Sequence, residues 1–288
     1  MPTVRLTDRA VIAVGGPGAE AFLQTLVTNA VATPRAGWST YAALLTPQGK
    51  VQFDFVIHGE AEGYLLDVAV EKTDDLLKRL KMYRLRAPVT LDARPDLAVF
   101  AAWASPTPPH PEEGALAPVP KDAPATDPRL PALGQRWIAP SDSIAPDADL
   151  AAYTLHRLTL GVPDSADVEG EFALDANFEE LHGVDFRKGC FVGQEVTARM
   201  KHKAQPRKRL VPVFISGELP PAGAPIEDAT GLAVGEMRSG SDRRAIASVR
   251  IERLVNTTDL VSAGLAIALT APAYPLPALK FDAAHGSE

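Results

Sequence analysis

The segment DFRKGCFVGQEVTAR, residues 185–199, carries the most informative pattern in the sequence. Its only thiol, Cys190, follows Lys188 and lies between two glycines, Gly189 and Gly193. The apolar spacing after the second glycine indicates a helix, so the thiol precedes a helix N-terminus. A helix N-terminus and a neighbouring cation each favour the thiolate over the thiol. We therefore predict that Cys190 is readily deprotonated and acts as a soft-metal ligand or a nucleophile.

Two other roles for this cysteine stay open at the level of sequence. An isolated cysteine is often a small buried hydrophobe, although the polar neighbours of Cys190 disfavour that role here. A Cys–His nucleophile is also conceivable, with His182 or His202 as the base. The spacing of the residues along the chain does not decide between these alternatives.

The cysteine count limits the metal chemistry of the chain. Cys190 is the only cysteine among 288 residues. An intrachain disulfide and a four-thiolate metal site within one chain are therefore both excluded. Any cluster bound through this thiol needs further ligands from a partner or from small thiols.

Composition excludes several classes of protein. Hydrophobic residues make up 46% and charged residues 23%, as in an ordinary globular protein rather than a disordered one. The formal net charge of −7 makes nucleic acid an unexpected partner. The N-terminus lacks a basic segment followed by an apolar one, and prolines interrupt the charge-free stretch 260–279. We therefore expect a cytoplasmic protein with no membrane partner.

The first half of the chain shows an α+β pattern. Residues 11–26 predict a strand, a glycine-rich turn and a helix, and residues 38–57 predict a β-hairpin. Alternation in its second strand places Val51, Phe53, Phe55 and Ile57 on one face and Asp54 on the other. Helices are predicted at 74–83 and at 149–160.

The rest of the chain differs in composition. The proline-rich segment 105–131 cannot form regular ladders and predicts an extended surface insertion. Beyond residue 210, short β-like runs separated by glycine and proline indicate a small all-β module. The run 199–209 holds six Lys or Arg and no acid. It is either a solvated linker or a site for an anion: a polyanionic small molecule, an acidic protein or RNA. RNA is the least favoured of these ligands, because the run has no aromatic residues on which bases could stack.

The octapeptide Lys188–Glu195 resembles the K-G-C-[FY]-x-G-Q-E signature of the YgfZ family, folate-binding proteins related to the glycine cleavage T-protein (aminomethyltransferase). Weaker similarities include Phe22–Asn29, Thr46–Lys50 and Leu155–Pro163. The resemblance implies an α+β T-protein-like fold of two subdomains around a central cavity, over residues 1–204. It also implies a C-terminal β-barrel over residues 205–288.

The resemblance further implies a tetrahydrofolate-binding factor for assembly or repair of iron–sulfur clusters. Cys190 would be a shared cluster ligand, with the remaining ligands from an A-type carrier protein, and Lys188 would favour its thiolate. Client iron–sulfur enzymes would be further partners. We predict folate-binding roles for Arg157, Gly189, Gly193, Gln194, Glu195 and Asp54, and the charge of Arg157 would suit the glutamate carboxylates of a folate.

One departure from the family bears on enzymatic activity. Aminomethyltransferases carry an Asp-Asp pair after the first hairpin, and the first of the two is catalytic. This sequence has Phe53-Asp54 there, and a phenyl ring cannot accept or orient a proton. Aminomethyltransferase activity is therefore not expected. A folate-dependent one-carbon transferase remains the alternative function, followed by an RNA-modification accessory protein.

Overall fold

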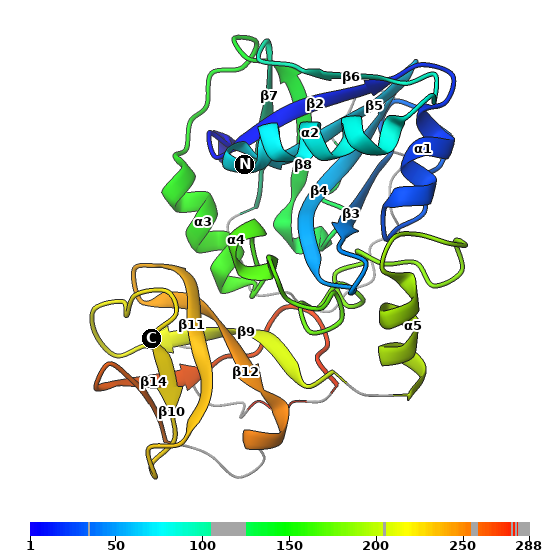
Figure 1. The fold of residues 1–288 in the computed structure, drawn as a ribbon. Helices are drawn as coiled ribbons and strands as arrows, with labels where there is room; N and C mark the ends of the chain where they lie inside the picture. The colour runs from blue at the N-terminus through cyan, green and yellow to red at the C-terminus, as the bar shows by residue number, and fades with distance from the viewer. Residues whose placement is uncertain are drawn as a thin grey trace, which may run out of the picture.

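The computed structural model describes residues 1–33, 35–104, 125–203, 206–254, 259–277, 279 and 281, with the side chain of residue 203 excepted. Two sheets and a closed barrel organise the chain, as Figure 1 shows. Most of the predicted proline-rich insertion, residues 105–124, lies outside the described residues. Its described end, residues 125–131, leads into the short 3-10 turn Pro131–Leu133.

A five-stranded antiparallel sheet with the order β3-β4-β5-β2-β6 forms the centre of the N-terminal part. One face packs against α1 and α2 around a buried apolar cluster. The strands are β2 (Arg9–Gly15), β3 (Ser39–Leu45), β4 (Val51–Glu60), β5 (Gly63–Ala69) and β6 (Thr90–Ala93), and the helices are α1 (Ala19–Leu26) and α2 (Thr73–Arg84). The 3-10 turn Val70–Lys72 precedes α2.

The sequence explains both helices. In α1, Phe22, Leu23 and Leu26 recur at helical spacing and are buried. In α2, Leu76 and Leu80 are buried, and acids occupy the first turn and bases the last, which suits the helix dipole. The predicted strand–turn–helix, hairpin and second helix are therefore confirmed.

Strand β4 contains a bulge at Gln52, where its pairing with β3 skips one residue. Val51 consequently lies in the same cluster as Val56, whereas Phe53 and Phe55 lie in the cluster beneath α1 and α2. The prediction that Val51 and Phe53 share a face is wrong, because strict alternation does not hold across a bulge.

A second sheet covers part of the other face of the five-stranded sheet. Its order is β1-β7-β8, and apolar residues of both sheets share one buried cluster. The strands are β1 (Thr3–Arg5), β7 (Leu97–Ala102) and β8 (Gln135–Pro140), followed by α3 (Leu150–Thr159) and the short α4 (Ser165–Val168). Asp149 caps α3, and Gly161 follows it at a φ of 73°, as the sequence predicted.

The C-terminal barrel is closed, with the strand order β10-β11-β12-β9-β14-β13. Its strands are β9 (Lys208–Ile215), β10 (Pro225–Glu227), β11 (Ala233–Ser241), β12 (Arg244–Arg250), β13 (Leu260–Ser262) and β14 (Leu265–Leu269), with a 3-10 turn at Ile251–Arg253. The predicted all-β module is confirmed as a barrel. Within the described residues, none of the helices has both the length and the apolar character needed to cross a bilayer.

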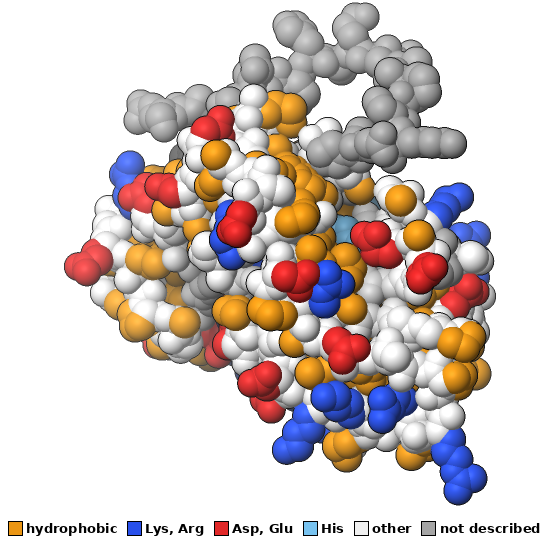
Figure 2. All heavy atoms as spheres, turned by 90° about the horizontal axis from the view of Figure 1, so that it is seen from above, with side chains coloured by type: hydrophobic (Ala, Val, Ile, Leu, Met, Phe, Trp, Pro, Cys, Tyr) orange, Lys and Arg blue, Asp and Glu red, His pale blue; other side chains and the backbone are white. Residues whose placement is uncertain are grey.

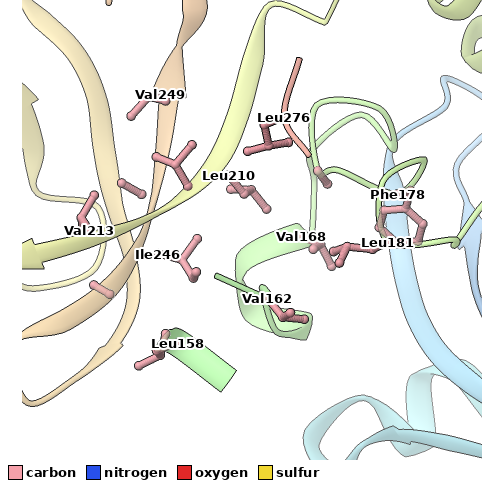
Figure 3. Close-up of a cluster of buried hydrophobic side chains, with 14 of the residues drawn as sticks. Leu158, Val162, Val168, Phe178, Leu181, Leu210, Val213, Ile246, Val249 and Leu276 are labelled. Carbon is pink, nitrogen blue, oxygen red and sulfur yellow. The ribbon is translucent and has the colours of Figure 1, made fainter. Parts of the chain in front are cut away.

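The barrel shares its core with the rest of the chain. Figure 3 shows Leu210 and Ile246 of the barrel near Leu158 and Val162, and Phe178 and Leu181 extend the same cluster toward the five-stranded sheet. A boundary at residue 204 therefore separates the barrel strands from the N-terminal sheets. The hydrophobic core, however, continues across this boundary. The two parts are expected to depend on each other for stability.

Candidate functional site

The candidate site is the segment 181–193, here called the cysteine loop, which ends at α5 (Gln194–Lys203). Cys190 is exposed near the end of this loop, just before the helix. Gly189 has a φ of 87°, in the left-handed region that favours glycine, and no atom lies within 4 Å of where its Cβ would be. The predicted position of the thiol, in a glycine-containing loop before a helix, is confirmed.

The cysteine loop packs against the turn of the β3–β4 hairpin. A Cβ on Gly193 would lie 2.6 Å from the Thr46 carbonyl oxygen and 3.1 Å from the Gly49 Cα. Reciprocally, a Cβ on Gly49 would lie 2.9 Å from the Cβ of Val196 in α5. The two sequence motifs, nearly 150 residues apart, thus meet at two glycines whose missing side chains permit the contact.

Lys188 attaches the loop to the end of α1. Its ammonium donates to the carbonyl oxygen of Gln24 at 2.6 Å and to that of Val27. The ammonium also lies 5.3 Å from the centre of the Phe191 ring. Burial lowers the pKa of Lys188 to about 8. These contacts give Lys188 an anchoring role, and its predicted effect on the thiolate stays a prediction.

Two polar residues after α1 hold the start of the cysteine loop. The Thr28 hydroxyl donates to the Gly183 carbonyl at 2.6 Å, and the Asn29 amide donates to the His182 carbonyl at 2.6 Å. The Asp185 amide in turn donates to the Thr28 carbonyl at 3.1 Å. The sequence offered Thr28-Asn29 only as a family similarity, and it gave no indication of their partners 150 residues away.

The loop closes onto α5 through its own hydrogen bonds. The Gln194 side-chain oxygen accepts from the Phe191 amide at 3.2 Å, and the Thr197 hydroxyl donates to the Gly193 carbonyl at 3.1 Å. Glu195 is exposed in the first turn of the helix. Gln194 therefore fixes the start of the helix, while Glu195 is free to face a partner.

Asp54, predicted to bind folate, is buried beneath the five-stranded sheet. It accepts a hydrogen bond of 3.0 Å from the Tyr41 hydroxyl, and the Tyr41 ring stacks on Phe178 with 4.9 Å between centres. Burial, together with the Asp54 carboxylate, raises the pKa of Tyr41 well above its usual value. The space next to Asp54 is about 10 Å³, room for about one water molecule. A pterin does not fit there.

Arg157, also predicted to bind folate, is buried in an ionic cluster. It donates to the Val162 carbonyl at 2.7 Å and lies 3.7 Å from carboxylate oxygens of Asp164 and Asp167. Its guanidinium therefore holds the segment that follows α3. Of the six residues predicted to bind folate, Asp54 borders the 10 Å³ space, and none of the six borders the 550 Å³ pocket beside α5.

A buried ionic network that the sequence did not reveal lies between the two sheets. Asp67 is fully buried and accepts from Arg9 Nε and Arg136 Nε, both at 2.6 Å. Burial alone would raise the pKa of Asp67, but Arg136 and Arg9 hold it well below its usual range. Asp127 and Arg129 form a second buried pair at 2.8 Å. The network joins β2, β5 and β8, far apart in the sequence.

Three of the six cations of the basic run 199–209 form ion pairs in the described structure, and Arg199 and Arg207 are exposed. Lys201 contacts Glu179, and Arg209 contacts Glu180 at 2.7 Å. These pairs border a pocket of about 550 Å³ between α5 and the C-terminal segment 273–277. Apolar residues of its wall include Leu174 and Met200. Where the described residues of the run border this pocket, its charge is therefore mixed.

Metal-binding groups are sparse around the thiol. Within the ranges that the structure describes, no group of three or more His, Cys, Asp or Glu residues could hold a metal ion. Cys190 would thus supply one ligand of a cluster at most. The site therefore offers one exposed thiol, on a loop that is anchored to α1 and to the β3–β4 turn, as a metal ligand or a nucleophile.

The fold and the site together define a protein of the aminomethyltransferase fold that carries an exposed cysteine loop. The chain superimposes on the glycine cleavage system aminomethyltransferase T from Bartonella henselae with a TM-score of 0.72 and 18% identity, covering 94% of this chain and 85% of that one. A family described as "CAF17, C-terminal beta-barrel domain" matches residues 207–275, the closed barrel. The predicted T-protein-like fold with a C-terminal barrel is therefore confirmed.

Sequence relatives identify the family. The iron–sulfur cluster assembly factor IBA57 of Homo sapiens is 33% identical, over 93% of this chain and 83% of the relative. The IBA57 of Mus musculus is 32% identical, over 87% of this chain and 78% of the relative. The chain belongs to the IBA57 family of iron–sulfur cluster assembly factors.

These relatives sharpen one prediction and correct another. The resemblance to YgfZ is confirmed as far as an iron–sulfur cluster assembly factor of T-protein fold, and the relatives carry the name IBA57. The prediction of a cytoplasmic location is wrong, because the relatives are named as mitochondrial proteins. Lack of a recognisable secretory signal was the basis for that prediction, and it does not distinguish cytoplasm from mitochondrion.

Proposed function

We propose that this protein assists iron–sulfur cluster assembly by supplying the Cys190 thiolate to a cluster that it shares with a carrier protein. The observation that carries the proposal is an exposed thiol on an anchored loop, in a family of cluster assembly factors. The exposure leaves the sulfur accessible to a partner. Client iron–sulfur enzymes would receive the cluster from this pair.

Partner sharing follows from the number of ligands. Iron–sulfur clusters are commonly held by four cysteine ligands, and this chain has one cysteine. An A-type carrier protein with several thiolates is the partner that the family resemblance implies. Glu195, exposed in the first turn of α5, and the ion pair of Lys201 with Glu179 offer polar contacts at the edge of such an interface.

The thiol-based function can be tested in cells that lack the endogenous protein. The C190A variant, at wild-type protein level, is expected to leave cluster-dependent enzymes inactive, whereas the surface variant L232A restores them fully. Leu232 is a suitable control because it is half exposed and belongs to the distant barrel. Full restoration by C190A would overturn the proposal.

We further propose that tetrahydrofolate binds in the 550 Å³ pocket between α5 and the segment 273–277. Its volume falls within the range of about 300–1,000 Å³ typical of small-molecule sites. Leu174 and Met200 offer an apolar wall for a ring, and Glu179 and Glu180 offer acceptors for amino groups. None of the six residues predicted to bind folate lines this pocket.

Folate binding is tested by titration with tetrahydrofolate. Ala273 is exposed at the pocket wall, so A273W should fill the space without disturbing the core and should abolish binding. C190A, as the matched control, should bind as the wild type does. Equal binding by A273W would overturn the location, and no binding by wild type would overturn the folate proposal while leaving the thiol proposal intact.

The alternative function, a folate-dependent one-carbon transferase, gains no support from the position of the expected catalytic acid. Phe53 packs in the apolar cluster beneath α1 and α2. The neighbouring Asp54 points to the opposite face and is hydrogen-bonded to Tyr41. A carboxylate at position 53 would lack a polar partner in this cluster.

A further inference from the structure

Exposed residues of α2 and the two residues that follow the helix form a surface, here called the α2 face: Lys78, Lys81, Met82, Arg84, Leu85 and Arg86. All six residues are exposed. The buried residues of the helix are Leu76 and Leu80, and Lys78, Lys81 and Met82 lie on its exposed side. Neither the cysteine loop nor the pocket beside α5 involves this face.

Charge on the α2 face is concentrated and unpaired. Residues 78–86 contain five Lys or Arg and no acid, in a chain whose net charge is −7. Within the described part of the chain, none of the five takes part in an ion pair, whereas Lys201 and Arg209 of the other basic run are paired with glutamates. Figure 2 shows Lys and Arg side chains gathered along its lower edge with hydrophobic side chains between them, on the side where α2 lies in front of the sheet in Figure 1.

Two large apolar side chains project among these cations. Leu85 is 86% exposed, the most exposed large hydrophobic residue described, and Met82 is 61% exposed. Leu85 also has a φ of 46°, in a region that costs energy for a residue with a Cβ. No burial in the isolated protein offsets that cost. Strained and exposed apolar residues are characteristic of surfaces that are covered in the functional state.

We propose that the α2 face is a docking surface for an anionic lipid bilayer. Its cations would lie over the acidic headgroups, and Leu85 and Met82 would enter the boundary between headgroups and acyl chains. The cations are complementary to a polyanion. The projecting apolar side chains favour a bilayer over RNA, because they have no partner on a phosphate backbone. This proposal departs from the sequence-based expectation of no membrane partner, which rested on the lack of a spanning segment; surface attachment needs none.

Vesicle co-sedimentation of the full-length protein tests the proposal. Wild-type protein should sediment with vesicles of phosphatidylcholine containing 30% phosphatidylglycerol and remain in the supernatant with pure phosphatidylcholine. Since each cation near an anionic surface contributes about a factor of five to binding, K78A/K81A should weaken it about 25-fold. M82S/L85S should weaken it about tenfold through lost apolar contact.

Matched controls separate this face from charge and hydrophobicity elsewhere. R199A/R207A removes two exposed cations from the other basic run, and L232S removes an exposed leucine from the barrel. Both should bind anionic vesicles within about twofold of wild type. Wild-type protein that stays in the supernatant with anionic vesicles overturns the proposal and makes an acidic protein the better occupant of the face. An equal loss in R199A/R207A and K78A/K81A also overturns it.

Discussion

Replacing Gly193 with alanine adds one methyl group at the point where the cysteine loop meets the β3–β4 turn. The new Cβ would lie 2.6 Å from the Thr46 carbonyl oxygen and 3.0 Å from the Leu45 Cβ. Neither neighbour is the flexible end of a side chain, because one is backbone and the other is a fully buried Cβ. The loop and the turn must therefore move apart to admit the methyl group.

Two costs add in this variant. The left-handed φ of 81° costs a residue with a Cβ about 1–2 kcal/mol. Forcing a methyl group into a packed contact costs about 1–3 kcal/mol more. We expect G193A to lower the free energy of unfolding by about 2–5 kcal/mol in urea denaturation. Because the same displacement moves the Cys190 segment, hydrogen exchange in the loop should also rise.

Gly189 provides the matched control. Its φ of 87° is nearly the same, yet no atom lies within 4 Å of its missing Cβ. G189A should therefore show the backbone cost alone, about 1–2 kcal/mol. The difference between the two variants measures the contact between the loop and the hairpin turn. Equal destabilisation by G189A and G193A would refute the reasoning, because it would show that the contact contributes nothing.

Three further predictions concern groups that hold the site and its scaffold. K188M keeps the apolar stem of Lys188 but removes its ammonium from the Gln24 and Val27 carbonyls. It should lower the free energy of unfolding by about 1–3 kcal/mol and raise hydrogen exchange in residues 24–29. Unchanged exchange there would contradict the anchoring role. D67N leaves Arg9 and Arg136 buried without their shared carboxylate. It should lower the free energy of unfolding by about 3–5 kcal/mol, measured by urea denaturation. A change near zero would show that the network does not stabilise the fold. Burial lowers the pKa of His156 below its usual 6.5, so the unfolded chain binds the proton more readily than the folded chain. The free energy of unfolding should therefore fall as the pH drops below about 6.5, and H156Q should lose this part of the pH dependence. An unchanged pH dependence in H156Q would exclude His156 as its source.

Local features of the chain were accessible from the sequence because nearby residues determine them. Helix α3 follows from an acidic cap and a terminal glycine, and α2 from the spacing of Leu76 and Leu80. The cysteine loop and the start of α5 follow from the octapeptide. The barrel was predicted as an all-β module from short runs between glycines and prolines, and only the strand pairing shows its closure.

Long-range features were not accessible for a physical reason. The target of the Lys188 ammonium is a pair of carbonyls more than 160 residues away, and backbone carbonyls carry no sequence signal. The Arg9–Asp67–Arg136 network combines three common residue types from three strands, with nothing local to mark them. The bulge at Gln52 reverses the face of Val51 without any glycine to indicate it.

Arg157 and Asp54 illustrate the limit of assigning a binding role from charge and position in the sequence. Both were predicted to bind folate, and here both side chains are buried and bonded to their own protein. Cys190 differs, because its sulfur is exposed and its loop is fixed by contacts on both sides. The thiol is therefore the residue on which the functional proposal rests.

The central claim is that Cys190 supplies one ligand to a cluster shared with a carrier protein. The most direct measurement mixes the purified protein with an A-type carrier bearing a [2Fe–2S] cluster and follows the visible circular dichroism of the cluster and the mass of the complex. Wild-type protein should give a cluster-containing heterocomplex with an altered spectrum, and C190S should leave the carrier's own spectrum unchanged. The same heterocomplex and spectrum with C190S would contradict the claim.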